Sequence, residues 1–144
     1  MKKVGKVLSL FSSLSEGQIN VTSLSLDIKG IIDDKHYDRN PDRAVLISSL
    51  YSYELMKEQS IISDYGTLGE NILMDYNIYH LKSGVRLKIG ANVVVELGQS
   101  CTLCKGLSAI NSKLPKLLKD DRGIFVKVIE SGVIYTDDAI YLLD

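Results

Sequence analysis

The sequence predicts a mainly β (α+β) fold, an antiparallel β-barrel that is closed or nearly closed and carries a few short helices. Short runs of β-branched and aliphatic residues recur along the chain, separated by turns rich in glycine, serine and asparagine, as in barrels and sandwiches. A chain of 144 residues is long enough for one core. We find no linker, repeat or low-complexity segment, so residues 1–144 are interpreted as a single domain.

The strand predictions rest on alternation and on glycine turns. Gly98 is expected to end the most strand-like run, which starts at Val93. Ser48 or Ser49 is expected to cap a helix that extends to about Gln59, and Ser112 a second, short one. The predicted strands cover residues 6–11, 18–21, 22–29, 43–47, 72–74, 85–89, 93–97, 123–129 and 138–142.

The composition excludes several function classes. Seventeen basic and eighteen acidic residues leave a net charge of −1, which gives no general attraction to nucleic acid or to an anionic membrane. No apolar run reaches membrane-spanning length, and the N-terminal residues are too interrupted for a signal peptide. We therefore expect a cytoplasmic protein with no nucleic-acid or membrane partner.

The segment after the Val93 strand carries both cysteines, Cys101 and Cys104. An accessible thiolate can be a nucleophile or a metal ligand, and Lys105 would favour it by its charge. A thioredoxin-type redox pair expects a βαβ setting that is missing here. Zinc is an alternative if His36 and His80 complete the ligand set, although their spacing supports only half of such a site. Burial as small apolar side chains is a further alternative.

A polar loop, residues 30–42, is the second place where function is expected. His36 lies there among several carboxylates, and the alternative is a solvated loop. The chain contains no GxSxG nucleophile turn. The segment with Gly66 and Gly69 lacks the Gly-Lys-Ser/Thr ending of a phosphate-binding loop and is therefore predicted to be a tight turn. His80 has no partner in the sequence and is interpreted as structural.

Five segments in order resemble motifs of the MOSC family, named for the C-terminal domain of molybdenum cofactor sulfurases, and its small bacterial members in particular. GIIDDKH at 30–36 followed by RAVL at 43–46 is similar to the family's GIxGDxH loop and the strand after it. GENI at 69–72 and LKSGVRLKIG at 81–90 resemble its next two motifs. VEL at 95–97 leading to CKGL at 104–107, and RGIFVKV at 122–128, complete the set.

The resemblance implies a barrel that binds the molybdenum cofactor or carries sulfur as a persulfide. Cys104 falls on the family's cysteine, the expected nucleophile or molybdenum ligand, with Cys101 as an auxiliary thiol. With a bound cofactor, reduction of N-hydroxylated compounds would need an external electron donor, and sulfur carriage would need a sulfur donor protein. The residues expected to line the pocket or to bind the cofactor are Asp34, His36, Arg43, Glu70, Asn71, Lys105 and Arg122.

The sequence departs from the family pattern at three glycine positions, one of which is Ser131, where the family often has two glycines. Asp33 and Asp137 stand where the family usually has glycine, and the Asp33 carboxylate is expected to repel an anionic cofactor. The alternative function is a non-catalytic β-barrel module for binding or structure, with zinc on the two cysteines. A simple thiol redox protein would instead form a reversible disulfide between Cys101 and Cys104.

Overall fold

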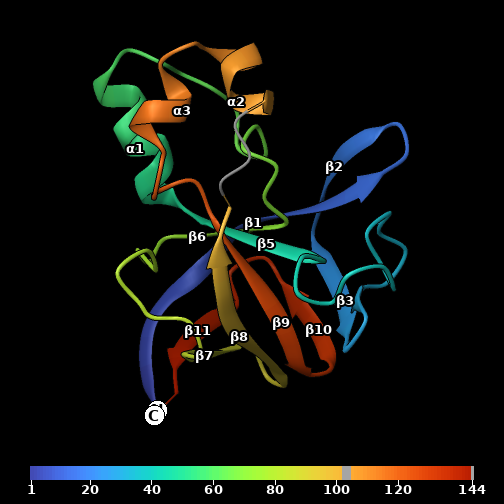
Figure 1. Ribbon diagram of the computed structural model, residues 1–144. Coiled ribbons are helices and arrows are strands. Elements are labelled where there is room, and N and C mark those ends of the chain that lie inside the picture. Colours follow the sequence, from blue (N-terminus) through green and yellow to red (C-terminus); the bar gives the residue numbers. More distant parts are fainter. Residues whose placement is uncertain (102–104, 144) are drawn as a thin grey trace.

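The computed structural model describes residues 1–101 and 105–143, which form a β-barrel with helices at one end (Figure 1). The strands are β1 (Lys2–Leu14), β2 (Gly17–Val21), β3 (Ser23–Asp27), β4 (Gly30–Ile31), β5 (Val45–Ser49), β6 (Ile72–Met74), β7 (Arg86–Ile89), β8 (Val93–Ser100), β9 (Ile124–Glu130), β10 (Gly132–Tyr135) and β11 (Ala139–Leu142). The helices are α1 (Leu50–Glu58), α2 (Lys105–Ile110) and α3 (Leu114–Leu117).

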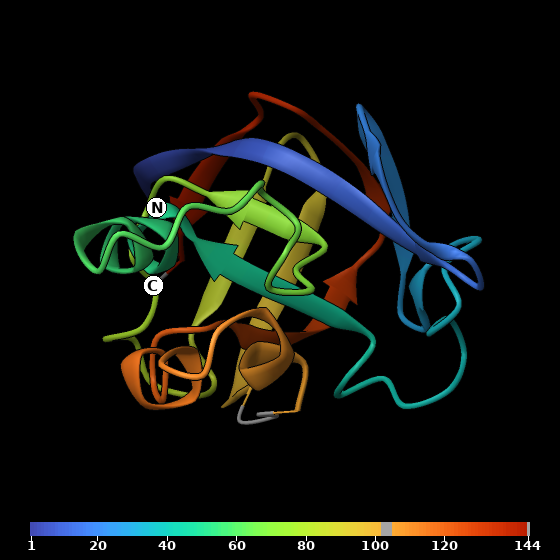
Figure 2. The same cartoon turned by 90° about the horizontal axis from the view of Figure 1, so that it is seen from above.

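The barrel closes because β1 pairs with β6 on one side and with β11, the first strand of the same sheet, on the other. The sheet order is β11-β7-β8-β9-β5-β6-β1-β2, and β11 also pairs with β1, so seven strands form a ring and β2 extends it. All of these pairings are antiparallel except β5 with β6, which is parallel because the chain crosses over through α1 between them. The predicted barrel is thereby confirmed. The termini lie close together at the end opposite the helices (Figures 1 and 2).

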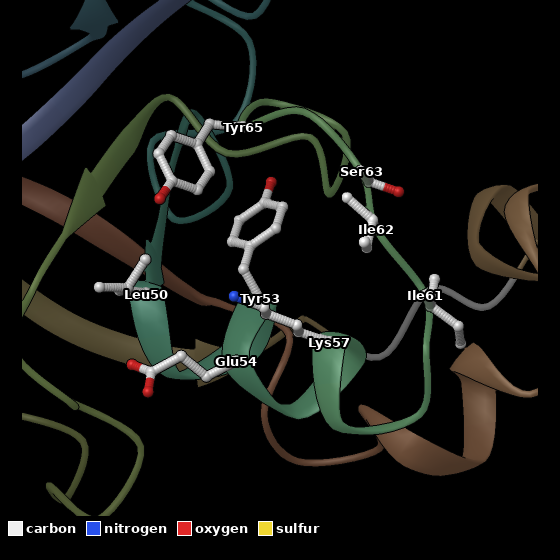
Figure 3. A pocket seen from close by; sticks show the side chains of 8 residues that line it. All are labelled: Leu50, Tyr53, Glu54, Lys57, Ile61, Ile62, Ser63 and Tyr65. Carbon is white, nitrogen blue, oxygen red and sulfur yellow. The ribbon is translucent and has the colours of Figure 1, made fainter.

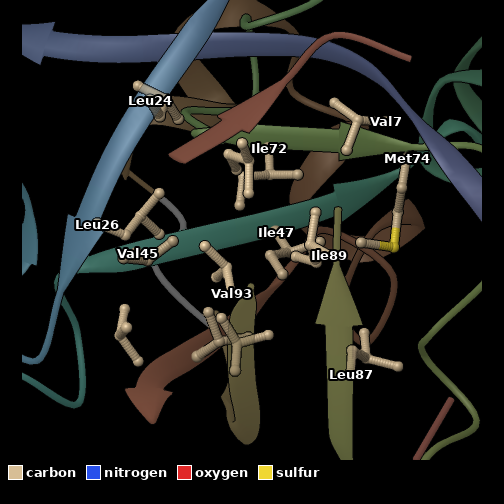
Figure 4. Packing of buried hydrophobic residues seen from close by; sticks show 14 of the residues in the cluster. Val7, Leu24, Leu26, Val45, Ile47, Ile72, Met74, Leu87, Ile89 and Val93 are labelled. Atoms are coloured by element: carbon tan, nitrogen blue, oxygen red, sulfur yellow. The ribbon is translucent and has the colours of Figure 1, made fainter. Parts of the chain in front are cut away.

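Inward-facing aliphatic side chains fill the barrel (Figure 4). Val45 and Ile47 point inward while Leu46 points to the outer face, as alternation along a strand requires. On β1 the alternation breaks, since a register shift between Val7 and Ser9 lets both Val7 and Leu10 face the core. A small second sheet, in the order β10-β3-β4, adds Leu24, Leu26 and Ile134 to the same core.

The helices pack on a second apolar cluster. Ser49 caps α1, its side chain accepting a hydrogen bond from Tyr51 N at 3.1 Å, as predicted. The cluster contains Tyr53, Met56, Leu68, Leu73, Leu107, Leu114 and Leu118. Within the described ranges, no helix has the length and apolar character needed to cross a membrane.

Several element predictions were wrong in detail. Gly98 does not end β8: the strand continues to Ser100 across a register shift against β9, because glycine fits the close approach to the Phe125 carbonyl. Ser112 does not cap a helix. The predicted short helix forms as α3, which begins after Lys113 without a side-chain cap, and α2 is an additional helix that was not predicted. β10 also forms where only a turn was predicted.

Candidate functional site

Five of the predicted site residues meet in one cavity of about 350 Å³. The cavity lies on the outer face of the barrel, where Leu46 of β5 is paired with Phe125 of β9. The lining residues run from His36 to Phe125 in the sequence and are brought together by the sheet. The lining residues are His36, Arg43, Ala44, Leu46, Gly69, Asn71, Cys101, Arg122 and Phe125.

Asn71 joins three parts of the chain at the wall of this cavity. Its Oδ1 accepts from Leu46 N at 3.0 Å, and its Nδ2 donates to Phe11 O at 3.2 Å and to Asp34 Oδ2 at 3.4 Å. The backbone N–H groups of Gly69 and Asn71 already donate to Gly66 O and Leu46 O. The Gly69 N–H therefore stabilises the turn, the Asn71 N–H joins the turn to β5, and neither of these two backbone donors is free for a ligand.

Asp34 does not line the cavity but lies directly behind it. Its side chain is only 1% exposed. Oδ2 accepts from Ser13 N at 2.7 Å, and Oδ1 accepts from His36 N at 2.9 Å and lies 3.1 Å from His36 Nδ1. Because a buried carboxylate needs such partners, Asp34 ties the 30–42 loop to β1 and orients the imidazole that reaches the cavity.

Two guanidinium groups supply the positive charge of the cavity. The Arg43 guanidinium lies over the Phe125 ring, 5.4 Å from the ring centroid. When the Gln99 amide is oriented with its oxygen toward Arg43, that oxygen accepts from Arg43 Nε at 3.2 Å and from Arg43 Nη2 at 3.3 Å. Arg122 donates from Nε and Nη2 to Leu68 O at 3.1 and 3.0 Å. Among the described lining residues there is no carboxylate, so an anion would meet positive charge.

Glu70, although predicted for the pocket, faces away from this cavity. It is fully buried, and its Oε2 accepts from Tyr53 OH at 2.6 Å and from Gly66 N at 3.0 Å. Oε1 has no hydrogen-bond partner among the described residues. Burial raises the pKa of Glu70 above its ordinary value, outweighing the hydrogen bonds that lower it.

A second recess of about 410 Å³ lies beyond Tyr53, between α1 and the segment that follows it (Figure 3). The Tyr53 and Tyr65 rings meet there edge to face, with centroids 5.1 Å apart. Tyr53 therefore separates this recess from Glu70, and burial raises the pKa of its hydroxyl. None of the residues predicted for the site lines this recess.

Of the two cysteines, only Cys101 falls within the described part of the chain. It is 3% exposed, packs with Leu46 and Phe125, and donates from its backbone N–H to Gly123 O at 2.9 Å. Cys104 lies outside the described residues, and so does the side chain of Lys105, at the start of α2. Within residues 1–101 and 105–143 no three His, Cys, Asp or Glu side chains are placed to hold a metal ion. His80 is exposed beside Tyr76, away from the cavity.

The two aspartates at family glycine positions both have a left-handed backbone, with φ of 70° at Asp33 and 74° at Asp137. Glycine adopts this region without cost, and Asp tolerates it better than most residues, so a local backbone requirement explains the family pattern. Asp33 is exposed and lines two other recesses on the far side of the loop, not the cavity. The expected proximity of its charge to a cofactor is therefore not observed.

Sequence reasoning missed Phe125 and Gln99 as neighbours of Arg43. Phe125 was predicted within a strand. Strand alternation could have shown that it faces the opposite side of the sheet from Ile124 and Val126, which lie in the core, but not that Arg43 lies beside it. Nothing in the sequence marks Gln99, because its position depends on β8 continuing past Gly98.

Comparisons with known proteins agree with this geometry. No curated protein matches the chain. Among solved structures, YuaD from Bacillus subtilis has a TM-score of 0.82 at 18% identity, covering 94% of this chain and 93% of that one. YiiM from Escherichia coli has a TM-score of 0.70 at 20% identity, and the match covers 96% of this chain and 70% of that one. YiiM from Geobacillus stearothermophilus has a TM-score of 0.69 at 15% identity, and the match covers 99% of this chain and 75% of that one. At these identities the likeness establishes the fold.

The sequence profile of the MOSC domain matches residues 34–141, well over half of the chain. The match begins at Asp34, includes every residue lining the cavity, and ends within β11. The family is associated with molybdenum-cofactor-related function. On this match, and with the barrel to support it, the chain belongs to the MOSC domain family.

Proposed function

We propose that the cavity binds the molybdenum cofactor, or carries sulfur, through a cysteine of the segment that follows β8 in the sequence. The observation that carries the proposal is that Arg43, Arg122 and Cys101 line one recess, in which no described lining residue is a carboxylate. A volume of about 350 Å³ falls within the range of roughly 300–1,000 Å³ of small-molecule sites. The residues present fit a small anionic group.

Each lining residue has a role that follows from its chemistry. Arg43 and Arg122 would hold the phosphate of the cofactor, since guanidinium groups match phosphate oxygens in a planar fork. His36 and Asn71 would contact the polar edge of the pterin. Lys105 is expected to add positive charge near Cys104. When bound, the cofactor supplies redox chemistry, for which reduction of N-hydroxylated compounds with an external electron donor is the proposed use.

Cys104 is proposed as the thiolate that ligates molybdenum or accepts sulfur, with Cys101 as auxiliary thiol. Soft thiolates suit a soft metal centre, and the thiolate is also the form that attacks a transferred sulfur. In the sulfur-carrying version the partner is a donor protein that presents a persulfide. Glu70 has no contact role in either version, because it faces Tyr53 instead of the cavity.

The test is elemental analysis with intact mass on protein purified without reductant from cells that make the cofactor. Wild type is compared with Cys104→Ser and with Cys101→Ser as the matched control. Molybdenum with a pterin mass, or an adduct of one sulfur, should be present in wild type and in Cys101→Ser and absent in Cys104→Ser. Wild type carrying neither would contradict the proposal. Stoichiometric zinc, lost with stability in Cys104→Ser, would instead support the structural-module alternative.

A further inference from the structure

β2 is the last strand of the eight-stranded sheet, and β1 is paired with only one of its two edges. Within residues 1–101 and 105–143 no strand pairs with the other edge of β2. The hairpin of β1 and β2 projects away from the barrel and from the helices (Figure 1). An edge of this kind presents a row of unpaired N–H and C=O groups, on which another strand can form.

The hydrogen bonds of β1 show which groups of β2 lie on that edge. Ser13 turns both of its backbone groups away from β2: its N–H donates to Asp34 Oδ2 at 2.7 Å, and its carbonyl accepts from Lys35 N at 2.8 Å. Phe11 N donates to Asn71 O at 2.8 Å. Hydrogen-bonded and non-hydrogen-bonded pairs alternate along an antiparallel ladder, so Ser13 and Phe11 form non-hydrogen-bonded pairs with β2.

Gln18 and Asn20 stand opposite these two residues, and their backbone N–H and C=O groups therefore point to the free edge. None of these groups has a partner among the described residues. Their side chains do not cover the edge, because each is hydrogen-bonded to a backbone carbonyl of the barrel. Gln18 Nε2 donates to Glu70 O at 2.9 Å, and Asn20 Nδ2 donates to Leu10 O at 3.0 Å. The edge is therefore open to another backbone.

The free edge also lacks the features that usually protect such an edge. Natural edge strands carry charged side chains, proline or bulges that block pairing. β2 consists of Gly17, Gln18, Ile19, Asn20 and Val21, with no charge and no proline, and its register against β1 is unbroken. Ile19, between the two outward-facing residues, is 47% exposed. No side chain of β2, all of whose residues the structure describes, opposes the addition of a strand, and Ile19 gains burial from it.

The edge of β2 is complementary to itself. Gln18 and Asn20 lie symmetrically about Ile19, so a two-fold axis beside Ile19 and perpendicular to the sheet places Gln18 of one copy opposite Asn20 of the other. The residues of each such pair exchange both N–H···O bonds, as in an antiparallel ladder. The two Ile19 side chains meet at a non-hydrogen-bonded position, where facing side chains are closest. A net charge of −1 per chain gives two copies little repulsion.

We propose that β2 pairs with β2 of a second copy, antiparallel and centred on Ile19, and so forms a two-fold symmetric dimer. None of the residues of this contact lines the cavity, so the proposal does not depend on the cofactor or sulfur role. Two strands of five residues bury less than the roughly 1,200 Å² of a standard interface. The dimer is therefore weak and reversible, and its population rises with protein concentration.

The first test is sedimentation of wild type and two charge variants from micromolar to millimolar concentration. Ile19→Lys places two like charges opposite each other at the two-fold axis and should weaken the dimer at least about tenfold. Ile28→Lys adds the same charge at an exposed isoleucine between β3 and β4 and should leave the dimer unchanged. A wild type that stays monomeric at millimolar concentration, with the edge left for a strand of another protein, would overturn the proposal. So would equal weakening by both variants.

A second pair of variants tests the edge hydrogen bonds without a change of charge. Asn20→Pro removes one outward N–H while the ladder with β1 keeps its bonds, because proline is accepted on the free side of an edge strand. Asn20→Ala lacks the same side chain but keeps the N–H. We expect the dimer to be lost in Asn20→Pro and retained in Asn20→Ala, with thermal melts to establish that both variants are folded. Dimers of equal strength in the two variants would contradict pairing through β2.

Amide hydrogen exchange of wild type, followed residue by residue by NMR, needs no variant. The N–H of Ile19 bonds to β1 and should be protected at every concentration. The N–H groups of Gln18 and Asn20 should exchange rapidly in dilute protein and become protected as the concentration rises. Exchange at these two residues that does not change while the protein dimerises would place the contact elsewhere and refute the proposal. A protein without cofactor or transferable sulfur can meet all of these expectations, so the two proposals fail separately.

Discussion

Glu70 and Asn71 are adjacent and almost fully buried, yet they face opposite sides of the chain. Asn71 faces the cavity, and both polar atoms of its side chain have partners. Glu70 faces Tyr53, and one of its oxygens has no partner among the described residues. The same short turn thus carries Asn71, whose side chain is fully hydrogen-bonded to other segments, and Glu70, whose burial disfavours the charged form of its carboxyl group. The two residues should respond differently to substitution and to pH.

The largest effect is expected from Asn71→Ala. Removing the side chain leaves Leu46 N and Phe11 O without their partners in a buried place, and each such loss costs about 1–3 kcal/mol. We expect the free energy of unfolding to fall by about 3 kcal/mol, measured by chemical denaturation. Asn20→Ala is the matched control, because Asn20 also donates to a β1 carbonyl, that of Leu10, at a more exposed position.

The comparison of the two asparagines separates their roles. We expect Asn20→Ala to cost about 1 kcal/mol or less, since water can replace the lost donor. Equal losses in the two variants would mean that Asn71 is an ordinary side-chain donor and not the joint between β1, β5 and the 30–42 loop.

Glu70→Gln should have a smaller effect that depends on pH. The pKa of Glu70 is raised in the folded protein, so the folded state binds the proton more tightly than the unfolded state does. Stability is then highest below the ordinary pKa of 4.5 and falls as pH rises toward the folded-state pKa. Glutamine has no charge to lose and should abolish this fall.

Denaturation of wild type and Glu70→Gln over acidic and neutral pH measures the difference. The variant should be at least as stable as wild type at neutral pH, and the difference between the two proteins should not grow as the pH is lowered. A wild-type stability that rises with pH while that of the variant does not would contradict the burial of an uncompensated carboxyl at Glu70.

The sequence predicted the barrel, the cap of α1 and five of the cavity residues, because these depend on local alternation, capping and family motifs. It did not predict which way Glu70 and Asn71 face. In a turn the direction of a side chain is set by backbone angles, here by φ of 86° at Gly69, and not by a repeating pattern. The extension of β8 past Gly98 was missed for a related reason, since glycine ends strands in one context and allows close packing in another.

A similar contrast between neighbours holds for Asp33 and Asp34, where the smallest effect is expected. Asp34 is buried and hydrogen-bonded behind the cavity, whereas Asp33 is exposed with φ of 70° and lines other recesses. In Asp33→Gly two effects on the free energy of unfolding oppose each other. Glycine adopts the left-handed backbone without strain, which stabilises the folded state, but it also gives the unfolded chain more conformational freedom, which destabilises the folded state. We therefore expect the free energy of unfolding to change by no more than about 0.5 kcal/mol.

Asp33→Gly should also leave anion binding in the cavity unaltered, because its charge lies across the loop and is screened by solvent. Titration of wild type and variant with inorganic phosphate, followed by NMR of the arginine side chains, measures this directly. A several-fold gain in phosphate affinity would mean that the Asp33 carboxylate acts on the cavity after all. Unchanged affinity would mean that glycine at this family position serves the backbone, and that aspartate can replace it without closing the cavity to anions.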